Sequence, residues 1–152
     1  MLRRRTRHRH DHRAPPLSAE QDAAVVRQLI DLVGGFEIDA ALGLVTDDVI
    51  LEFPFRGDGG PRRLEGDEAK DFIRALPKLF SQMPFHDVVV HGRLPSGDVV
   101  AEYRSEGVTR SGRAYPNSYV GFFEVRDGRV RRWREYFDPN VVAAAFPARP
   151  TP

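Results

Sequence analysis

The stretch Val130-Arg131-Arg132-Trp133-Arg134-Glu135-Tyr136-Phe137-Asp138-Pro139 has the composition of a β-strand that ends at a helix start. Aromatic and β-branched residues fill it, and the hairpin-turn dipeptide Asp127-Gly128 precedes it. Because strand side chains alternate between two faces, Trp133, Glu135 and Phe137 share one face. If that face is buried, Glu135 lies in an apolar cavity and is a candidate general acid or base.

The alternative is that this face of the strand is exposed to solvent. Glu135 would then be an ordinary surface acid, or one paired with Arg132 or Arg134. Because Trp133 and Phe137 flank the acid on its own face, we favour the cavity. Burial in apolar surroundings disfavours the ionised carboxylate, which suits an acid or base that works near neutral pH.

The rest of the chain has helical patterns first and strands afterwards. Ser18 and Gln21 form a capping box, and apolar residues at helical spacing follow as far as Gly34-Gly35. Further helices are predicted around 39–45, from Gly66 or Asp67 to a stop or kink at Pro77, and at 141–146. Strands are predicted at 49–53, 88–92, 99–108, 115–125 and 130–137.

This order predicts an α+β fold in which the N-terminal helices pack on one face of a strongly curved antiparallel sheet. Such a sheet forms a cone-shaped barrel with an internal pocket, which is a typical site for a small molecule. We expect one cone domain at 17–147, between a disordered basic tail at 1–16 and a C-terminal tail at 148–152.

Composition excludes several classes of protein. The 152 residues include no cysteine, which excludes disulfides, thiolate metal ligands and a cysteine nucleophile. No apolar run approaches the roughly 18 residues of a membrane span, and no secretory signal pattern is present, so we expect a cytoplasmic protein. The sequence has no phosphate-binding loop, dinucleotide-binding glycine motif or metal triad, so neither a metal nor a cofactor is implied.

The net charge of +1 hides a basic N-terminus, because residues 1–13 hold six arginines and one aspartate. We expect this segment to be a solvated extension, and nucleic acid is not an expected partner. The alternative is a basic arm that contacts nucleic acid or acidic lipid and recruits the domain as an interaction module.

Several short sequences carry a family resemblance, namely Gly112-Arg113-Ala114-Tyr115, Gly121-Phe122-Phe123, Asp127-Gly128 and Trp133-Arg134-Glu135-Tyr136-Phe137-Asp138. With the order of elements, they resemble the SnoaL-like group of the nuclear-transport-factor-2-like superfamily over about residues 17–147. That group includes polyketide cyclases, and ketosteroid isomerase and limonene epoxide hydrolase are relatives. The resemblance implies the cone fold, a small-molecule pocket and often a homodimer formed through the sheet. The superfamily also contains ligand carriers and interaction domains, so the fold does not settle the function.

Among these relatives, the epoxide hydrolases offer the nearest residue pattern. Glu135 matches their acid that activates water, and Arg104 and Glu106 match an Arg-x-Asp pair that protonates and holds the epoxide oxygen. Their water-fixing tyrosine and asparagine match Ile50 and Glu52, so that pair is absent here. The alternative for Arg104 and Glu106 is a solvated stripe of cross-strand ion pairs.

The predicted site combines this resemblance with the residue pattern. The expected catalytic residues are Glu135, Arg104 and Glu106, and the expected pocket residues are Glu52, Phe53, Tyr119, Trp133 and Phe137. The alternative for Glu52 is an exposed strand position. Tyr103, Tyr115 and Tyr119 either donate to a ligand oxygen or pack in the core, and Asp138 is expected to cap a helix.

Two functions follow from this site. The first is a cofactor-independent isomerase, cyclase or epoxide hydrolase in which Glu135 is the acid or base and Arg104 or a tyrosine stabilises a developing oxyanion. The second is a non-catalytic binding domain for an apolar metabolite, which the missing tyrosine and asparagine favour. An apolar small molecule is the expected partner in both.

Overall fold

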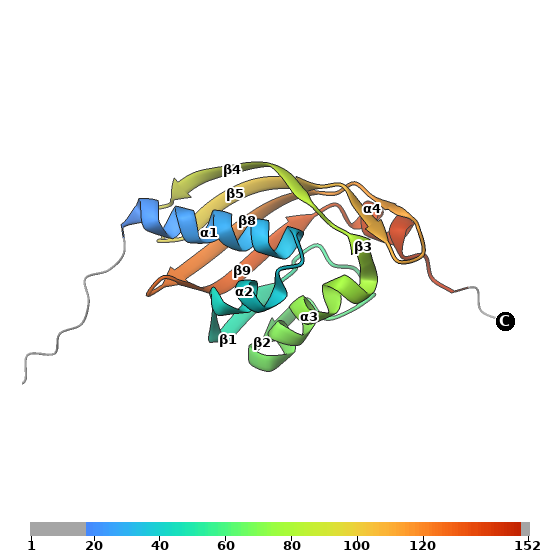
Figure 1. Ribbon diagram of the computed structural model, residues 1–152, viewed down its shortest axis with the longest axis horizontal. Coiled ribbons are helices and arrows are strands. Elements are labelled where there is room, and N and C mark those ends of the chain that lie inside the picture. The colour runs from blue at the N-terminus through green and yellow to red at the C-terminus, as the bar shows by residue number, and fades with distance from the viewer. Residues whose placement is uncertain (1–17, 150–152) are drawn as a thin grey trace, which may run out of the picture.

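Six strands form a strongly curled sheet in the computed structural model, which describes residues 18–149 (Figure 1). Their order across the sheet is β2-β1-β9-β8-β5-β4. Their bounds are β1 Val45–Glu52, β2 Arg63–Glu65, β4 Phe85–Arg93, β5 Val99–Ser105, β8 Ser118–Arg126 and β9 Arg129–Phe137. Neighbouring strands are antiparallel except β1 and β9, which run parallel.

The predicted α+β cone is confirmed, but its sheet does not close into a barrel. The edge strands β2 and β4 each pair with one neighbour within this sheet. Helix α3 (Gly66–Leu79) packs against β2, and helix α1 (Ala19–Gly34) packs against β4. Helices therefore cover the two edges, and no hydrogen bonds between the edge strands are needed to close the cone.

A smaller sheet with the order β3-β6-β7 extends one end of the cone. Its strands are β3 Phe80–Gln82, β6 Gly107–Thr109 and β7 Ala114–Tyr115. The sequence predicted single strands at 99–108 and 115–125, whereas β6 and β7 are separated from β5 and β8 by interruptions at 106 and 116–117. At the second interruption, side-chain hydrogen bonds of Asn117 take the place of strand pairing.

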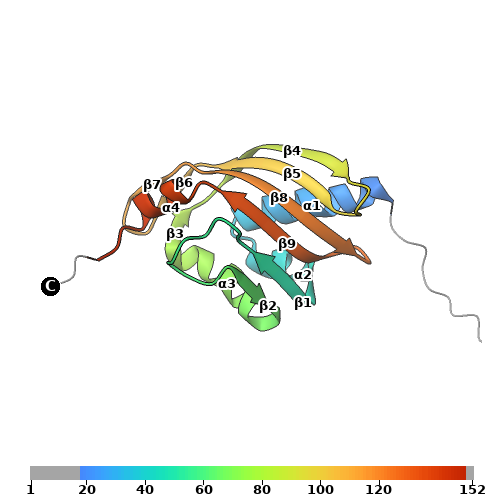
Figure 2. The ribbon, with the colours of Figure 1, turned by 180° about the vertical axis from the view of Figure 1, so that it is seen from behind.

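The other two helices are α2 (Ile38–Gly43) and α4 (Pro139–Ala145). Helices α1, α2 and α3 lie on the concave side of the sheet, and α4 lies at the end that holds β6 and β7 (Figure 1). Seen from behind, the sheet lies in front of α1 (Figure 2). The side chain of Asp138 accepts a hydrogen bond from the backbone of Asn140 at 2.9 Å, so it caps α4 as predicted.

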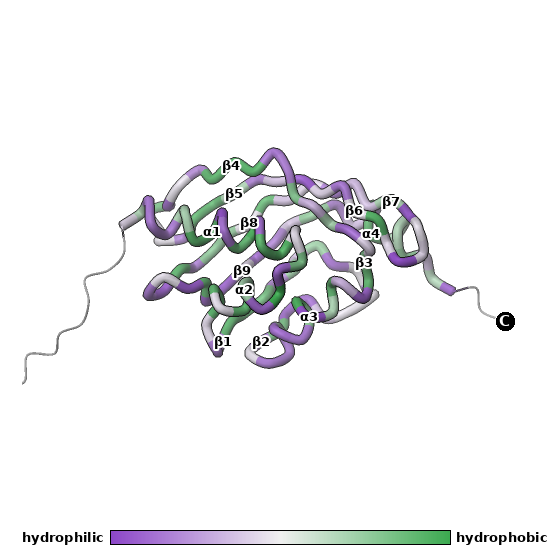
Figure 3. Tube along the Cα trace, viewed as in Figure 1, coloured by the Kyte–Doolittle hydropathy of each residue, from purple (hydrophilic) through white to green (hydrophobic). Residues whose placement is uncertain are grey.

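Helix α1 begins and ends as the sequence predicts. The backbone N–H of Gln21 donates to Ser18 Oγ at 3.1 Å, and that of Ser18 donates to Gln21 Oε1 at 2.8 Å. Hydrophobic and hydrophilic residues alternate along the helix (Figure 3), and its core face is completely buried. Burial of each such aliphatic side chain stabilises the fold by about 1.5–3 kcal/mol. The residues of this face are Val26, Leu29, Ile30 and Val33.

Helix α3 runs past Pro77, which was expected to end or kink it, as far as Leu79. The proline lies in the last turn, where it removes one backbone N–H but leaves few later residues that need a helical partner. The N–H of Phe80 still donates to the carbonyl oxygen of Leu76, which closes the helix.

Some predictions lie outside the described residues. The disordered basic tail at 1–16 and the last three residues of the tail at 148–152 are among them. Within residues 18–149, no helix is both long enough and apolar enough to cross a membrane.

Candidate functional site

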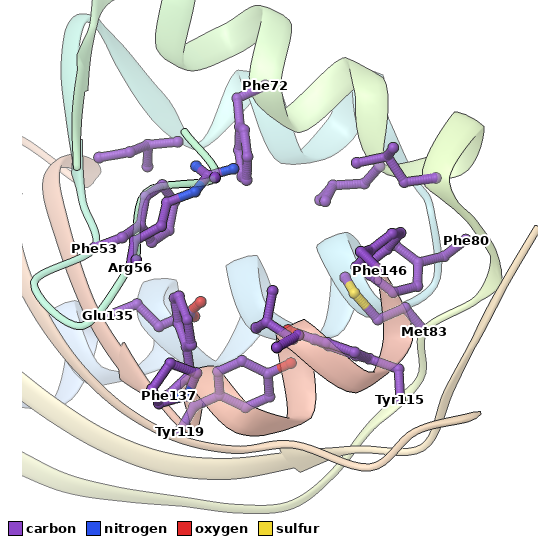
Figure 4. Close-up of a pocket in the computed structure, with 18 of the residues that line it drawn as sticks. Phe53, Arg56, Phe72, Phe80, Met83, Tyr115, Tyr119, Glu135, Phe137 and Phe146 are labelled. Carbon is purple, nitrogen blue, oxygen red and sulfur yellow. The ribbon is translucent and has the colours of Figure 1, made fainter. Parts of the chain in front are cut away.

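The concave face of the sheet, together with α3 and α4, encloses a cavity of about 630 Å³ (Figure 4). That volume lies within the range of about 300–1,000 Å³ that is usual for small-molecule sites. Most of its wall is apolar, and the charged side chains in the lining are Arg56, Asp58 and Glu135. Among the apolar lining residues are Leu51, Phe72, Ile73, Phe80, Met83, Phe85 and Phe146.

Glu135 projects from the middle of β9 into this cavity and is only 8% exposed. Small residues beside it make room for its side chain. Glu135 lies directly opposite Gly121 on β8, and Gly121 lies opposite Ala101 on β5. A Cβ atom at position 121 would lie 2.5 Å from the ring of Phe123 and 3.2 Å from the hydroxyl oxygen of Tyr103. The site therefore requires glycine at this position.

A chain of hydrogen bonds holds the Glu135 carboxyl group. The indole Nε1–H of Trp133 donates to the hydroxyl oxygen of Tyr103 at 3.2 Å, and the Tyr103 hydroxyl donates to Oε2 of Glu135. The donor directions are fixed, because an indole N–H can only donate. Among residues 18–149, Glu135 forms no ion pair with a lysine, arginine or histidine. The alternative of an arginine-paired acid is therefore wrong.

Burial raises the pKa of Glu135 from 4.5 to about 7, and the hydrogen-bond donors Tyr103 and Trp133 lower it in part. The carboxyl group thus changes its charge near neutral pH. Burial, followed by the nearby charge of Glu135, raises the pKa of Tyr103 well above its ordinary value. Tyr103 therefore remains a protonated donor whenever Glu135 is ionised.

Tyr119 lies parallel to Tyr103, with ring centres 5.0 Å apart, and Phe85 packs edge-on against both rings. Its hydroxyl oxygen is 2.9 Å from Ser105 Oγ, which itself donates to the carbonyl oxygen of Tyr115 at 3.1 Å. Since a serine hydroxyl has one hydrogen, Tyr119 is the donor to Ser105. Burial raises the pKa of Tyr119, so it stays neutral.

Tyr115 has a hydroxyl group that also lies in the cavity lining. Its oxygen accepts a hydrogen bond from Asn117 Nδ2 at 3.2 Å, and the hydroxyl also interacts with the neighbouring hydroxyl of Tyr119. Burial raises the pKa of Tyr115, which keeps its hydroxyl protonated. Figure 4 shows the hydroxyls of Tyr115 and Tyr119 pointing into the cavity that Glu135 borders.

The structure places most of the sequence-predicted pocket residues around Glu135. Phe53, Tyr119, Trp133 and Phe137 line the same cavity. Strand alternation accounts for this arrangement, because each of these residues occupies an inward position of β8 or β9 or directly follows β1. Whether they contact a ligand stays a prediction.

Arg104 and Glu106 do not lie in the cavity, so their predicted placement is wrong. Both are exposed, and the neighbouring Tyr103 and Ser105 are buried instead. Glu106 lies 3.6 Å from His86 in a surface ion pair. The epoxide hydrolase pattern would need the charged face of β5 to point inward, and the buried aromatic and serine positions occupy that side.

Glu52 is also outside the cavity, contrary to the prediction. Its carboxylate lies 3.8 Å from the guanidinium groups of both Arg63 and Arg132 on the outer side of the sheet. The adjacent Leu51 and Phe53 face the cavity. Both are apolar, so β1 offers no counterpart of the water-fixing pair of the epoxide hydrolases. Of the three acids compared with the epoxide hydrolase pattern, Glu52 and Glu106 lie outside the cavity and Glu135 lines it.

Sequence reasoning missed Arg56 and Asn117 and left the role of Tyr115 open. Arg56 and Asn117 lie between strands, where no periodic pattern reveals which way a side chain points. The sequence holds only a weak signal for Arg56, namely a charged residue between Phe55 and a glycine-rich loop. Within residues 18–149, no three histidine, aspartate or glutamate side chains gather as a metal-binding group.

Comparison with known proteins agrees with this architecture. A model of the SnoaL-like domain matches residues 26–133, and the chain belongs to that family. The uncharacterized protein YesE of Bacillus subtilis is 37% identical over 105 residues, which are 68% of this chain and 71% of YesE. The uncharacterized PhzA/B-like protein PA3332 of Pseudomonas aeruginosa is 30% identical over 94 residues, or 59% of this chain and 64% of that protein.

Solved structures show the same fold. A presumed isomerase from Bacillus subtilis matches with a TM-score of 0.77 and 30% identity, covering 84% of this chain and 93% of that protein. A presumed polyketide cyclase from Xanthomonas campestris matches with a TM-score of 0.70 and 24% identity, covering 84% and 97%.

Proposed function

We propose that this protein binds an apolar small molecule in its cavity and that Glu135 transfers a proton on that molecule, without a cofactor, in an isomerase or cyclase reaction. The observation that carries the proposal is the position of Glu135. Its carboxyl group is buried, has no cationic partner among residues 18–149, and borders a cavity large enough for a ligand. A carboxyl group with a pKa of about 7 suits both removal and return of a proton at neutral pH.

The proposed reaction begins with the ionised form of Glu135. The carboxylate removes a proton from a carbon next to a carbonyl group, and the electron pair of the broken C–H bond moves to the carbonyl oxygen. The hydroxyl of Tyr115, which lines the cavity and stays protonated, rotates toward that oxyanion and stabilises it by donating a hydrogen bond. Neutral Glu135 then returns the proton to another carbon in an isomerisation. In a cyclisation, the enolate carbon attacks a second carbonyl group and Glu135 protonates the new alkoxide.

Two observations favour proton transfer over epoxide hydrolysis. The Arg104 and Glu106 pair is exposed, and the residues that face the cavity at the end of β1 are Leu51 and, directly after the strand, Phe53. Neither Leu51 nor Phe53 has a polar group that could hold a water molecule or protonate an epoxide. The relatives are consistent with this reaction type, since one structural match is a presumed isomerase and another a presumed polyketide cyclase.

The alternative function is a non-catalytic binding domain for an apolar metabolite. The apolar wall of the cavity favours it, as does the engagement of the Tyr119 hydroxyl with Ser105. Such a carrier would bind a ligand without exchanging its protons. The predicted homodimer, the cytoplasmic location and a partner for the N-terminal arm stay predictions.

Proton exchange into a simple carbon acid tests the proposal. The probe is 2-tetralone, an apolar ketone with acidic C–H bonds, in deuterated buffer at pH 7.5. We expect the wild type to accelerate loss of the proton signal next to the carbonyl, and Glu135→Gln to bind the ketone without accelerating exchange. Binding without acceleration by the wild type would support the carrier instead. Equal acceleration by both proteins would exclude Glu135 as the base.

A further inference from the structure

Arg56 is a cation in the cavity wall that the proposed proton transfer does not use. It lies between β1 and β2, and its guanidinium carbon is 5.5 Å from the ring centre of Phe53 and 5.4 Å from that of Phe72. Figure 4 shows it beside these two rings, at the border of the open space that Glu135 also lines. The faces of two aromatic rings attract and position the cation.

The polar contacts of Arg56 leave most of its donors unused. Nη1 donates to the carbonyl oxygen of Pro61 at 3.3 Å. Within residues 18–149, no carboxylate forms an ion pair with Arg56, and its Nε and Nη2 atoms donate no hydrogen bond. Burial lowers the pKa of the guanidinium, because the group has lost part of its hydration. A partly dehydrated cation without a counter-ion is unfavourable unless a ligand supplies the charge.

The loop holds the guanidinium in a defined position. Arg62 Nε donates to the backbone carbonyl oxygen of Arg56 at 3.0 Å, and the N–H of Arg56 donates to the carbonyl oxygen of Phe53 at 3.0 Å. A Cβ atom at Gly60 would lie 2.9 Å from Nη2 of Arg56, so glycine lets the guanidinium pack against the loop backbone. A binding group that is already in place loses little conformational entropy when a ligand arrives.

One ligand can reach both Arg56 and the acid. Arg56, Tyr115 and Glu135 line the same cavity of about 630 Å³, and Figure 4 shows them around one open space. The remaining charged residue of the lining, Asp58, is exposed at the rim, where water and salt screen its repulsion of an anion.

We propose that the ligand is an apolar carboxylic acid whose carboxylate binds Arg56 while its hydrophobic body fills the cavity and a reactive carbon faces Glu135. This inference rests on the proposed function and names its class of substrate. Nε and Nη2 form the edge of the guanidinium that matches the two oxygens of a carboxylate. The apolar surroundings strengthen this charge-assisted pair relative to one in water.

A matched pair of ligands tests the inference. The probes are 2-naphthoate and 2-naphthamide, which share a ring system and differ in charge, and calorimetry at pH 7.5 measures their affinities. We expect the wild type to bind 2-naphthoate at least tenfold more tightly than 2-naphthamide. In Arg56→Gln this preference should fall to less than threefold, with the affinity for 2-naphthamide unchanged. Arg56→Lys should retain part of this preference, because an ammonium group keeps the positive charge but lacks the two parallel N–H donors of the guanidinium.

Two further variants make the result unambiguous. Arg74→Gln removes an exposed arginine that pairs with Asp71 on α3 and does not line the cavity, so it should keep the full preference. Arg56→Met keeps an apolar stem against the two rings and serves as a second neutral variant if Arg56→Gln does not fold. Thermal unfolding shows which variants are folded.

Each contrary result has a distinct meaning. Equal affinity of the wild type for both ligands would overturn this inference and leave the apolar pocket of the proposed function intact. A preference that survives in Arg56→Gln and Arg56→Met would overturn the role of Arg56. Failure of the wild type to bind either ligand up to its solubility limit would overturn the inference and the proposed pocket together.

Discussion

Gly121 and Glu135 face each other across β8 and β9, and the missing side chain at Gly121 gives Tyr103 its path to the carboxyl group. The hydroxyl oxygen of Tyr103 lies only 3.2 Å from the place that a Cβ atom at 121 would occupy. The hydrogen bond that orients the candidate acid thus depends on a residue with no functional group of its own. Glycine at this position belongs to the site as much as the acid does.

Gly121→Ala should therefore disturb both stability and chemistry. The added methyl group would lie 2.5 Å from the Phe123 ring, and overpacking of this kind costs about 1–3 kcal/mol of unfolding free energy. Displacement of Tyr103 should also raise the pKa of Glu135. Denaturant unfolding measures the first effect and NMR titration the second. Gly43→Ala is the control, because a Cβ atom there meets nothing within 4 Å. Equal stability of the two variants would contradict the packing argument.

Tyr103→Phe should raise the pKa of Glu135 above about 7. The Tyr103 hydroxyl donates to Oε2 of the ionised carboxylate and so lowers the pKa of Glu135. Without this donor, less opposes the effect of burial, which raises that pKa. The indole N–H of Trp133 also loses the Tyr103 hydroxyl as an acceptor and keeps only its interaction with Glu135, so stability should fall by about 1 kcal/mol. Carbon-detected NMR titration of Glu135 measures the pKa. An unchanged or lower value would show that Tyr103 does not hold the carboxyl group.

Strand alternation allowed much of the fold and the position of Glu135 to be predicted. In β9, Trp133, Glu135 and Phe137 share a face, and two aromatic neighbours identify it as the buried one. The same rule applied to β5 gives a face of Ala101, Tyr103 and Ser105 and a face of charged residues. The charged face is exposed. Arg104 and Glu106 follow this alternation and lie on the exposed side, which the motif resembling the epoxide hydrolases does not predict.

Other parts of the site could not be predicted from the sequence. Arg56 and Asn117 lie in segments where the backbone follows no regular repeat, so their partners depend on contacts between residues distant in sequence. Asn117, for example, bonds to the backbone of Asp138, 21 positions away. The open edges of the sheet were likewise not predictable, because helix packing rather than strand pattern determines whether a curled sheet closes.

Asn117→Ala should destabilise the protein by roughly 2–4 kcal/mol. Its side chain is 1% exposed and accepts hydrogen bonds from the N–H groups of Ser118 (2.8 Å) and Asp138 (2.9 Å). Loss of these acceptors leaves backbone donors unpaired, at about 1–3 kcal/mol each. Asn117→Asp keeps the acceptor oxygen but removes the donor to Tyr115, so it should be less destabilising in denaturant unfolding. Equal losses in both variants would place the stabilisation elsewhere.

The raised pKa of Glu135 predicts that stability falls as the pH increases. Below about pH 4.5 this carboxyl group is protonated in both the folded and the unfolded chain, and its contribution is fully present. Between about 4.5 and 7 the unfolded chain loses the proton while the folded protein keeps it, so unfolding becomes easier. Above about pH 7 both forms are ionised and the loss is complete, on the order of 3 kcal/mol.

Glu135→Gln isolates this effect, because glutamine stays neutral at every pH and its amide oxygen can still accept from Tyr103. Other titrating groups contribute equally to both proteins and cancel in the difference. Denaturant unfolding is measured at pH 4, 5.5, 7 and 8. The unfolding free energy of Glu135→Gln should rise relative to that of the wild type as the pH increases, with most of the change between pH 5 and 7. A constant difference would mean that the acid is hydrated in the folded protein. In that case the carboxyl group would not be a base tuned to neutral pH, and the carrier function would become the better explanation of the cavity.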